Sequence, residues 1–257
     1  MRPNLMGKLT ALLLALCMLP AISLATEEER PPAVRSNVII KGYPPPIIPL
    51  SPRVDDSYFA DILLVGDSLS SGIPHYKVMP ALEVSYMIGV YARHIAESNE
   101  VVRKKGRKPM TLPDYLVEQD PRVVYIWIGL NDIEDHPAEQ VLPHYHVMLN
   151  RLIEAMPNTL FCLMEVTPVT KDAQRRRRAL SNQNVLDFNA GLYELAREHN
   201  IYLLQIHAGL MDDSGVIQPK LVDNDGFHLS RFGYIEVVDY LYTHTLPLDL
   251  ITFRDQR

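Results

Sequence analysis

The feature that most constrains the fold is a set of short apolar runs in which hydrophobic and polar residues do not alternate. Residues 62–65 read Ile-Leu-Leu-Val, and residues 123–128 read Val-Val-Tyr-Ile-Trp-Ile. A strand with one face in water alternates apolar and polar residues, whereas a strand covered on both faces does not. These runs therefore predict a parallel sheet with helices on both of its faces.

Helical patterns separate the apolar runs from Ala60 onward, as expected for repeated strand–helix–strand units. The predicted strands are Asp61–Val65, Leu82–Met87, Val123–Ile128, Leu160–Glu165 and Ile201–Ile206. The predicted helices are Val90–Ala96, Leu112–Glu118, Pro137–Ala155, Val185–Glu198 and Arg231–Tyr242. The sequence thus predicts an α/β fold with a five-stranded parallel sheet, in a single domain over residues 59–257.

The first 25 residues have the three parts of a secretory signal peptide. Arg2 and Lys8 precede an apolar run over residues 9–19, and Ser23-Leu24-Ala25 is a small-x-small cleavage site. We expect cleavage after Ala25 and a secreted or periplasmic protein without stable membrane insertion. The alternative is an uncleaved segment that tethers the chain to a membrane. A lipidated Cys17 is disfavoured because Leu16 precedes it, where a small residue is expected.

Residues 26–58 are rich in proline, which predicts an extended, semi-rigid N-terminal arm or linker. The formal charge of the chain is −6, and removal of Arg2 and Lys8 would make it about −8. That balance gives no electrostatic case for nucleic acid as a partner. After cleavage Cys162 would be the one cysteine left, so we expect a buried thiol and no internal disulfide.

A serine stands directly after the first predicted strand, in Gly66-Asp67-Ser68-Leu69. The carboxyl ends of parallel strands are the usual place for ligands in open α/β sheets. Backbone N–H groups that converge there can hold a developing negative charge. The plainer alternative is that Asp67 or Ser68 caps the next helix, which would begin there.

Two similar stretches follow later strands. Gly89 comes after the second strand, where a glycine lets the backbone approach another group closely, although an ordinary turn would also explain it. Asn131, in Gly129-Leu130-Asn131-Asp132, follows the third strand, and its amide is a neutral donor suited to an oxyanion. The alternative there is a turn closed by an Asx motif.

A carboxylate and a histidine stand three residues apart in Asp225-Gly226-Phe227-His228, ahead of the last predicted helix. The Asp225 carboxylate could accept from the Nδ1–H of His228, which would leave Nε2 free to act as a base. The alternative is structural: Asp225 and Gly226 form a turn, and Ser230 caps the helix that starts at Arg231.

Together the four stretches resemble the SGNH hydrolase family, also called GDSL-type esterases and lipases, in residue type and in chain order. Gly66-Asp67-Ser68-Leu69 resembles the family's nucleophile block, and Gly89 resembles its second-block glycine. Gly129-x-Asn131-Asp132 and Asp225-x-x-His228 resemble the third and last blocks. The resemblance covers roughly residues 60–246.

The resemblance implies a flavodoxin-like three-layer α/β/α sandwich and ester hydrolysis by a serine, with no metal and no cofactor. Carried over, Ser68 attacks the acyl carbonyl, His228 takes its proton and later protonates the leaving alcohol, and Asp225 orients the imidazolium. The backbone N–H groups of Ser68 and Gly89 and the amide of Asn131 would form the oxyanion hole.

Three other residues near these blocks are expected to be structural. Asp67 and Asp132 would tie loops together through backbone N–H groups. Trp127 would lie in the core, because its strand neighbours are mostly apolar.

The chain has two basic runs. Residues 98–108 are expected to form a basic surface loop. Arg175-Arg176-Arg177-Arg178 follows the fourth predicted strand, near the same sheet edge as Ser68. It is either a solvated charged face or an anionic recognition patch in which Arg176 and Arg177 bind a phosphate or carboxylate of the substrate.

The family does not fix the substrate, which is a small-molecule or polymer-linked ester. Secretion and the proline-rich arm favour an O-acetyl group on a carbohydrate or cell-wall polymer. The alternatives are a lipid or lysophospholipid ester, O-acyl transfer to an acceptor, or a non-catalytic glycan- or protein-binding domain on the same fold. The sequence does not specify an oligomeric state.

Overall fold

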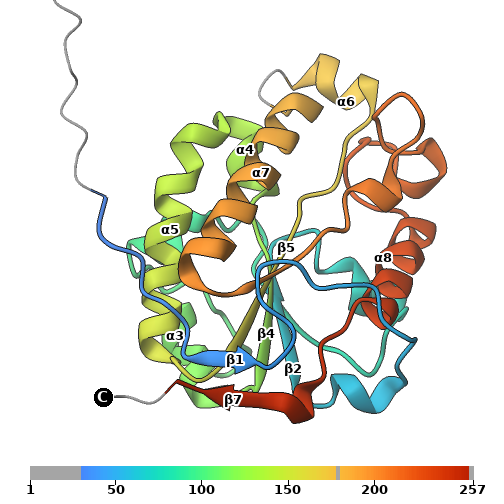
Figure 1. Ribbon diagram of the computed structural model, residues 1–257. Helices are drawn as coiled ribbons and strands as arrows, with labels where there is room; N and C mark the ends of the chain where they lie inside the picture. The colour runs from blue at the N-terminus through green and yellow to red at the C-terminus, as the bar shows by residue number, and fades with distance from the viewer. Residues whose placement is uncertain (1–29, 178–179, 255–257) are drawn as a thin grey trace, which may run out of the picture. The chain divides into compact units, whose positions relative to one another are not determined.

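A five-stranded parallel sheet forms the centre of the molecule. The computed structural model describes residues 30–177 and 180–254, and its main compact unit runs from Pro32 to Arg257 (Figure 1). The strand order is β3-β2-β4-β5-β6, in which the first strand of the sheet lies second from one edge, as in flavodoxin-like folds. The five strands are β2 (Ile62–Gly66), β3 (Glu83–Tyr86), β4 (Val123–Trp127), β5 (Leu160–Met164) and β6 (Tyr202–Leu204). The predicted fold class and sheet are confirmed.

The central strands are buried along their whole length, as the lack of alternation predicts. Every residue of β2, β4 and β5 is buried, and Trp127 lies in the core with no exposed surface. The parallel register pairs Gly66 with Trp127 on one side and with Tyr86 on the other. The strand ends that precede Ser68, Gly89 and Asn131 are therefore brought side by side.

Helices cover both faces of the sheet. The helix α5 contacts α2, α3 and α7, whereas α8 contacts α1, and Figure 1 shows α5 and α7 on the side of the sheet away from α8. This arrangement gives the three layers of an α/β/α sandwich. The eight α-helices of the described chain are α1 (Gly72–Tyr76), α2 (Ala92–Ala96), α3 (Leu112–Gln119), α4 (Leu130–Asp135), α5 (Ala138–Ala155), α6 (Lys171–Arg176), α7 (Asn182–His199) and α8 (Arg231–Thr243).

The elements that the sequence did not predict are short. The helices α1, α4 and α6 have five or six residues each, too few for an amphipathic period to show. Two three-residue strands, β1 (Val38–Ile40) and β7 (Ile251–Phe253), pair antiparallel across most of the chain's length. Four 3₁₀ turns complete the described structure: Asp56–Phe59, Ala208–Leu210, Pro219–Leu221 and Leu248–Leu250.

From Pro32 onward the proline-rich segment belongs to the same compact unit as the sheet. Ile47 forms a parallel bridge with Leu203 of β6, where the N–H of Leu203 donates to the Pro46 carbonyl at 2.6 Å. An edge strand with unpaired backbone groups invites pairing with another chain, and this bridge covers the edge at β6. Ile40 and Ile48 of the segment are buried.

The predicted signal peptide and Cys17 lie outside the described residues. Among residues 30–177 and 180–254, no helix is long and apolar enough to span a bilayer. Cys162 is a free, buried thiol in β5, and burial raises its pKa.

Candidate active site

Ser68, His228 and Asp225 form a chain of two hydrogen bonds at the carboxyl edge of the sheet. Ser68 Oγ lies 3.0 Å from His228 Nε2, and His228 Nδ1 lies 2.7 Å from Asp225 Oδ2. All three side chains are partly exposed, so a ligand can reach them. A nucleophile within reach of a base, and a base held by a third group, is the arrangement expected of nucleophilic catalysis.

The loop before α8 fixes the relative positions of Asp225 and His228. Asp225 Oδ1 accepts from the backbone N–H groups of Phe227 and His228, at 3.1 and 3.0 Å. Partial burial raises the pKa of Asp225, but the hydrogen bonds from the His228 ring and from these two N–H groups outweigh it, so the pKa is lowered. The carboxylate therefore stays charged beside the imidazole. Ser230 caps α8 by accepting from the Gly233 N–H, so the structural alternative for this stretch also holds.

Ser68 does not cap a helix. The helix α1 begins at Gly72, later than the expected start at Asp67 or Ser68, and a series of tight turns fills the gap. Side chains of the loop stabilise these turns, since Ser70 Oγ donates to the Asp67 carbonyl and Ser71 Oγ donates to the Ser68 carbonyl. The Ser68 hydroxyl is thereby left for His228.

Three donors near Ser68 keep unused hydrogen-bonding capacity. Within the described residues, the backbone N–H groups of Ser68 and Gly89 donate to no acceptor. Gly89 has φ +70°, a conformation that side-chain-bearing residues rarely adopt, so a glycine suits this turn. Asn131 Nδ2 uses one hydrogen on the Val90 carbonyl, at 3.1 Å, and has a second to offer. These are the three groups predicted to form an oxyanion hole.

Asp67 ties the nucleophile loop to the loop that carries Asn131. Its two carboxylate oxygens accept from the N–H groups of Leu69 at 2.9 Å and Gly129 at 3.3 Å. Full burial raises the pKa of Asp67 to about 6, although these N–H bonds oppose the shift. Gly129 itself has φ +138°, and an added Cβ would lie 2.6 Å from the Phe188 ring, so a side chain there would strain the backbone and displace that ring.

Asp132 makes a second tie of the same kind, from α4 to the segment after Gly89. Both of its carboxylate oxygens accept from the Ala92 N–H, at 3.0 and 3.1 Å. Burial raises the pKa of Asp132 to about 7, with an added contribution from the nearby charge of Asp67. The structural roles predicted for Asp67 and Asp132 are confirmed.

The two arginines predicted near the site contact the Asp225–His228 loop. Arg176 Nη2 donates to the Asp225 carbonyl at 2.8 Å and pairs with Asp172 at 3.2 Å. The Arg177 guanidinium lies 4.7 Å from the centre of the Phe227 ring.

Arg177 also pairs with Glu134 of α4, on the helix that carries Asn131. Both guanidinium groups are thus engaged by groups of the protein. Arg178 lies outside the described residues.

A groove of about 470 Å³ begins at the Gly89 segment. Residues 86–90 form one part of its lining, and the rest comes from His94, Asn99, Glu100, Val101 and Arg103. Tyr86 and Ile88 are 47% and 68% exposed at its rim. The groove therefore runs along the surface from the segment that carries the Gly89 N–H.

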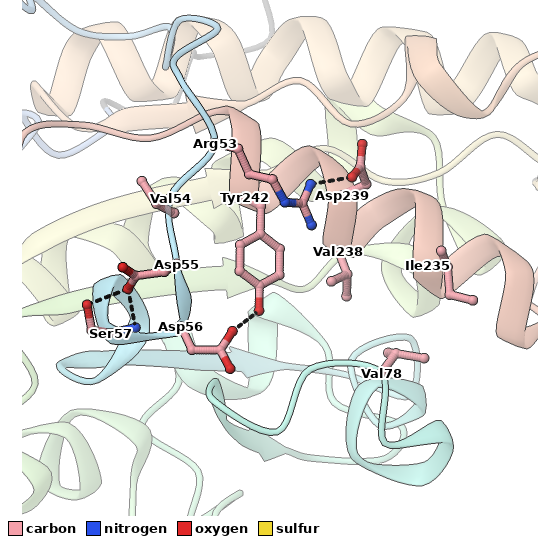
Figure 2. A pocket seen from close by; sticks show the side chains of 10 residues that line it. All are labelled: Arg53, Val54, Asp55, Asp56, Ser57, Val78, Ile235, Val238, Asp239 and Tyr242. Atoms are coloured by element: carbon pink, nitrogen blue, oxygen red, sulfur yellow. Dashed lines mark hydrogen bonds and ion pairs between the residues drawn. The ribbon is translucent and has the colours of Figure 1, made fainter.

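A larger groove, of about 710 Å³, lies away from these residues between the proline-rich segment and α8 (Figure 2). Its charged groups already have partners in the protein. Arg53 pairs with Asp239 and lies over the Tyr242 ring, and the Tyr242 hydroxyl donates to Asp56. Figure 2 shows these contacts holding residues 53–57 against α8, so this groove is a packing seam of the arm.

The described residues hold no group of three or more His, Cys, Asp or Glu side chains that could bind a metal ion.

The GDSL-like Lipase/Acylhydrolase family model matches residues 64–234, and the chain belongs to this family of ester-hydrolysing enzymes. The matched span contains all four stretches described above. No curated protein matches the sequence.

Solved structures with the same fold include a GDSL-like lipase from Bacteroides thetaiotaomicron, at 14% identity and a TM-score of 0.54, which covers 72% of this chain and 87% of the other. A lipase/acylhydrolase from Enterococcus faecalis aligns at 15% identity and a TM-score of 0.50, covering 70% and 91%. A candidate acylhydrolase from Bacteroides fragilis aligns at 16% identity and 0.55, covering 74% and 88%. These likenesses support the fold.

Sequence reasoning missed the groups that connect the site's loops. Glu134 and Phe227 hold Arg177, and the Thr170 N–H donates to the Gly226 carbonyl at 3.0 Å. No local pattern marks such long-range contacts. One part of the groove lining could be found from the sequence, because Arg103 is the first residue of the basic run 103–108.

Proposed function

We propose that this protein is a secreted serine esterase whose nucleophile is Ser68. His228 Nε2 removes the hydroxyl proton as Ser68 Oγ attacks the acyl carbonyl, and the resulting oxyanion is held by the N–H groups of Ser68 and Gly89 and by the Asn131 amide. The imidazolium then protonates the leaving alcohol. Water, deprotonated by His228, releases the acid and restores Ser68. Asp225 keeps Nδ1 protonated and stabilises the imidazolium throughout.

The observation that carries the proposal is the Ser68–His228–Asp225 chain, at 3.0 and 2.7 Å. A serine hydroxyl is a weak nucleophile unless a base lies within hydrogen-bond reach, and both distances meet that need. The unused donors beside it suit a tetrahedral intermediate, for which each preset donor contributes about 3 kcal/mol.

The substrate favoured by this site is an O-acetyl ester on a carbohydrate or cell-wall polymer. The groove that leaves the Gly89 segment is open and carries polar side chains, which suits a polymer-linked ester. The exposed Tyr86 and Ile88 keep a lipid or lysophospholipid ester as the second candidate. A preference of the enzyme for long-chain over acetyl p-nitrophenyl esters would favour the lipid ester.

The test is hydrolysis of p-nitrophenyl acetate by the purified protein and by Ser68→Ala and His228→Ala. We expect both variants to lose at least about a thousandfold in kcat with unchanged thermal unfolding. The matched control is His144→Ala, which removes an exposed histidine of α5 that contacts neither Ser68 nor Asp225. Full activity in Ser68→Ala would refute the mechanism.

Labelling by a fluorophosphonate separates an enzyme from a binding domain. A site assembled as described reacts at Ser68, and Ser68→Ala abolishes the label. A protein that neither hydrolyses the ester nor takes the label would instead be a glycan- or protein-binding domain on this fold. Acyl transfer is distinguished by adding a sugar alcohol and measuring whether acetyl moves to it or to water.

A further inference from the structure

The basic loop, residues 103–108, joins the groove beside Gly89 to a set of unpaired cations. Val102 and Met110 bridge the ends of the loop through paired backbone hydrogen bonds, both at 3.1 Å. Arg103 lines the groove, so the loop begins where the groove ends. A ligand in the groove would extend from the segment that carries the Gly89 N–H to this loop.

Three of the loop's five cations have no ion-pair or hydrogen-bond partner within residues 30–177 and 180–254. Arg107 pairs with Glu118, and Lys104 Nζ lies 5.0 Å from the centre of the Tyr115 ring. Arg103, Lys105 and Lys108 are exposed, and they form no ion pair or hydrogen bond through their side chains with any described residue. This is a local excess of positive charge in a chain whose formal charge is −6. The one carboxylate among the residues that line the groove is Glu100, which forms no ion pair with any described residue.

The chemistry of the groove suits an acidic glycan better than a lipid. Its lining beyond the Gly89 segment is mostly polar, from His94, Asn99 and Glu100 to Arg103. An acyl chain would leave these groups without hydrogen-bond partners, which costs binding free energy. Sugar hydroxyls can satisfy them, and the exposed Tyr86 ring offers a face on which a sugar can stack.

We propose that the groove and the basic loop bind an O-acylated acidic glycan, with its anionic groups on Arg103, Lys105 and Lys108. The proposal rests on the proposed function for the position of the ester, since the glycan's acyl group must lie at Ser68. In this proposal the groove and the basic loop recognise the glycan, which is the alcohol part of the ester. The negative charge on the rest of the molecule disfavours anions elsewhere and directs them to this loop.

The first experiment measures binding without catalysis. The parent protein is titrated calorimetrically with oligogalacturonate, which carries carboxylates and no ester, and with a neutral maltooligosaccharide of equal length. We expect binding of oligogalacturonate only, weakened about tenfold by the triple variant Arg103→Gln, Lys105→Gln and Lys108→Gln, because each exposed charge pair contributes roughly a factor of two. Raised salt should weaken it further, since the charges are screened.

The matched control is Lys41→Gln, Lys171→Gln and Lys220→Gln, which removes the same charge from exposed positions outside the groove. It should weaken binding less than about twofold. Equal weakening in both triple variants would overturn the proposal, and so would a parent that does not bind oligogalacturonate. Binding to phosphatidylglycerol vesicles without binding to oligogalacturonate would also overturn it, in favour of a lipid surface.

A second variant keeps the test decisive if the triple variant does not fold. Glu100→Gln removes the only carboxylate in the groove lining and should tighten oligogalacturonate binding by about twofold. Weaker or unchanged binding would contradict a glycan carboxylate at this position.

Turnover then separates this proposal from the proposed function. The parent should release acetate from chemically acetylated polygalacturonate with a lower KM than from acetylated dextran, and the triple variant should remove that difference. Hydrolysis of both polymers with the same KM would overturn the proposal while leaving the esterase intact. Specific oligogalacturonate binding without hydrolysis of either polymer or of p-nitrophenyl acetate would refute the esterase and leave the binding site standing.

Discussion

The two basic runs of this chain read alike in sequence and differ in structure. In the arginine turn, residues 175–177, every guanidinium is engaged: Arg175 and Arg176 pair with Asp172, and Arg177 pairs with Glu134. In the basic loop, residues 103–108, Arg103, Lys105 and Lys108 have no such partner among the described residues. A run of like charges therefore says little about ligand binding until the partners of its members are known.

The difference extends to the two sides of the candidate site. The arginine turn lies on the triad side, where Arg176 and Arg177 contact the Asp225–His228 loop and Glu134 of α4 pairs with Arg177. The basic loop lies on the oxyanion side, where the Gly89 N–H and one hydrogen of Asn131 have no acceptor within the described chain. Both sides are held by internal bonds, since Asp67 and Asp132 tie the loops of the oxyanion side together. Only the oxyanion side, however, keeps backbone and amide donors for a ligand among the described residues. The predictions below test this division.

The largest effect is expected from Asn131→Ala, on the oxyanion side. Loss of one preset donor should lower kcat by about a hundredfold to a thousandfold for every ester, with little change in KM, because the donor acts on charge that develops in the transition state. Steady-state kinetics with a neutral and an anionic acetyl ester measure this. A change confined to KM would place Asn131 in ground-state binding instead.

A smaller effect, about tenfold in kcat, is expected from Arg177→Ala on the triad side, because small losses of alignment reduce catalysis strongly. If Arg177 positions the loop through Phe227, neutral and anionic esters should be affected equally, and Glu134→Gln should reproduce much of the loss. Arg177→Lys, which keeps the charge, should restore part of the rate.

Arg175→Ala is the matched control for this experiment, because the Arg175 side chain is 72% exposed and its ion pair among the described residues is with Asp172. It should leave both esters unaffected. A rise in KM for the anionic ester alone, in Arg176→Ala or Arg177→Ala, would instead support the anionic recognition patch that the sequence leaves open as an alternative for these two residues.

Much of the site could be predicted because its parts are local. Ser68, Gly89, Asn131 and His228 each stand just after a strand or before a helix, and a parallel sheet gathers those positions on one edge. An apolar run without polar alternation is also a local signal. The bounds of β2, β4 and β5 could therefore be predicted to within a residue or two. The helices α1, α4 and α6 could not be predicted, because five or six residues are too few to show the helical period of apolar residues.

The partners of the two basic runs could not be predicted in the same way. Asp172 precedes Arg175 and Arg176 by three and four residues, which is the spacing of a helical ion pair, but α6 was not predicted. Glu134 lies 43 positions before Arg177, and the two residues meet only in the folded chain. Sequence alone therefore could not show which run was left for a ligand.

The smallest predicted effect is on the pH dependence of stability. It comes from the buried carboxyl of Asp132 on the oxyanion side and is opposite in sign to the effect of the half-exposed Asp225. The pKa of Asp132 is raised to about 7 by burial, from an ordinary value of 3.8. Between these values the native state keeps a proton that the unfolded chain has lost, so stability falls as pH rises from about 4 to 7. The pKa of Asp225 is lowered in the native state, so its ionisation makes stability rise with pH, and only at more acidic pH.

Asp132→Asn keeps an oxygen to accept from the Ala92 N–H and cannot ionise, so it should remove part of this pH dependence. Between pH 5 and pH 8 the fall in Tm should be about 5 °C smaller than in the parent, corresponding to roughly 2 kcal/mol. Differential scanning calorimetry of both proteins measures it, with the exposed Asp213→Asn as the control that should follow the parent. An identical slope in Asp132→Asn would mean that Asp132 is charged in the native state over the whole range. The tie to Ala92 would then be a charge-assisted hydrogen bond.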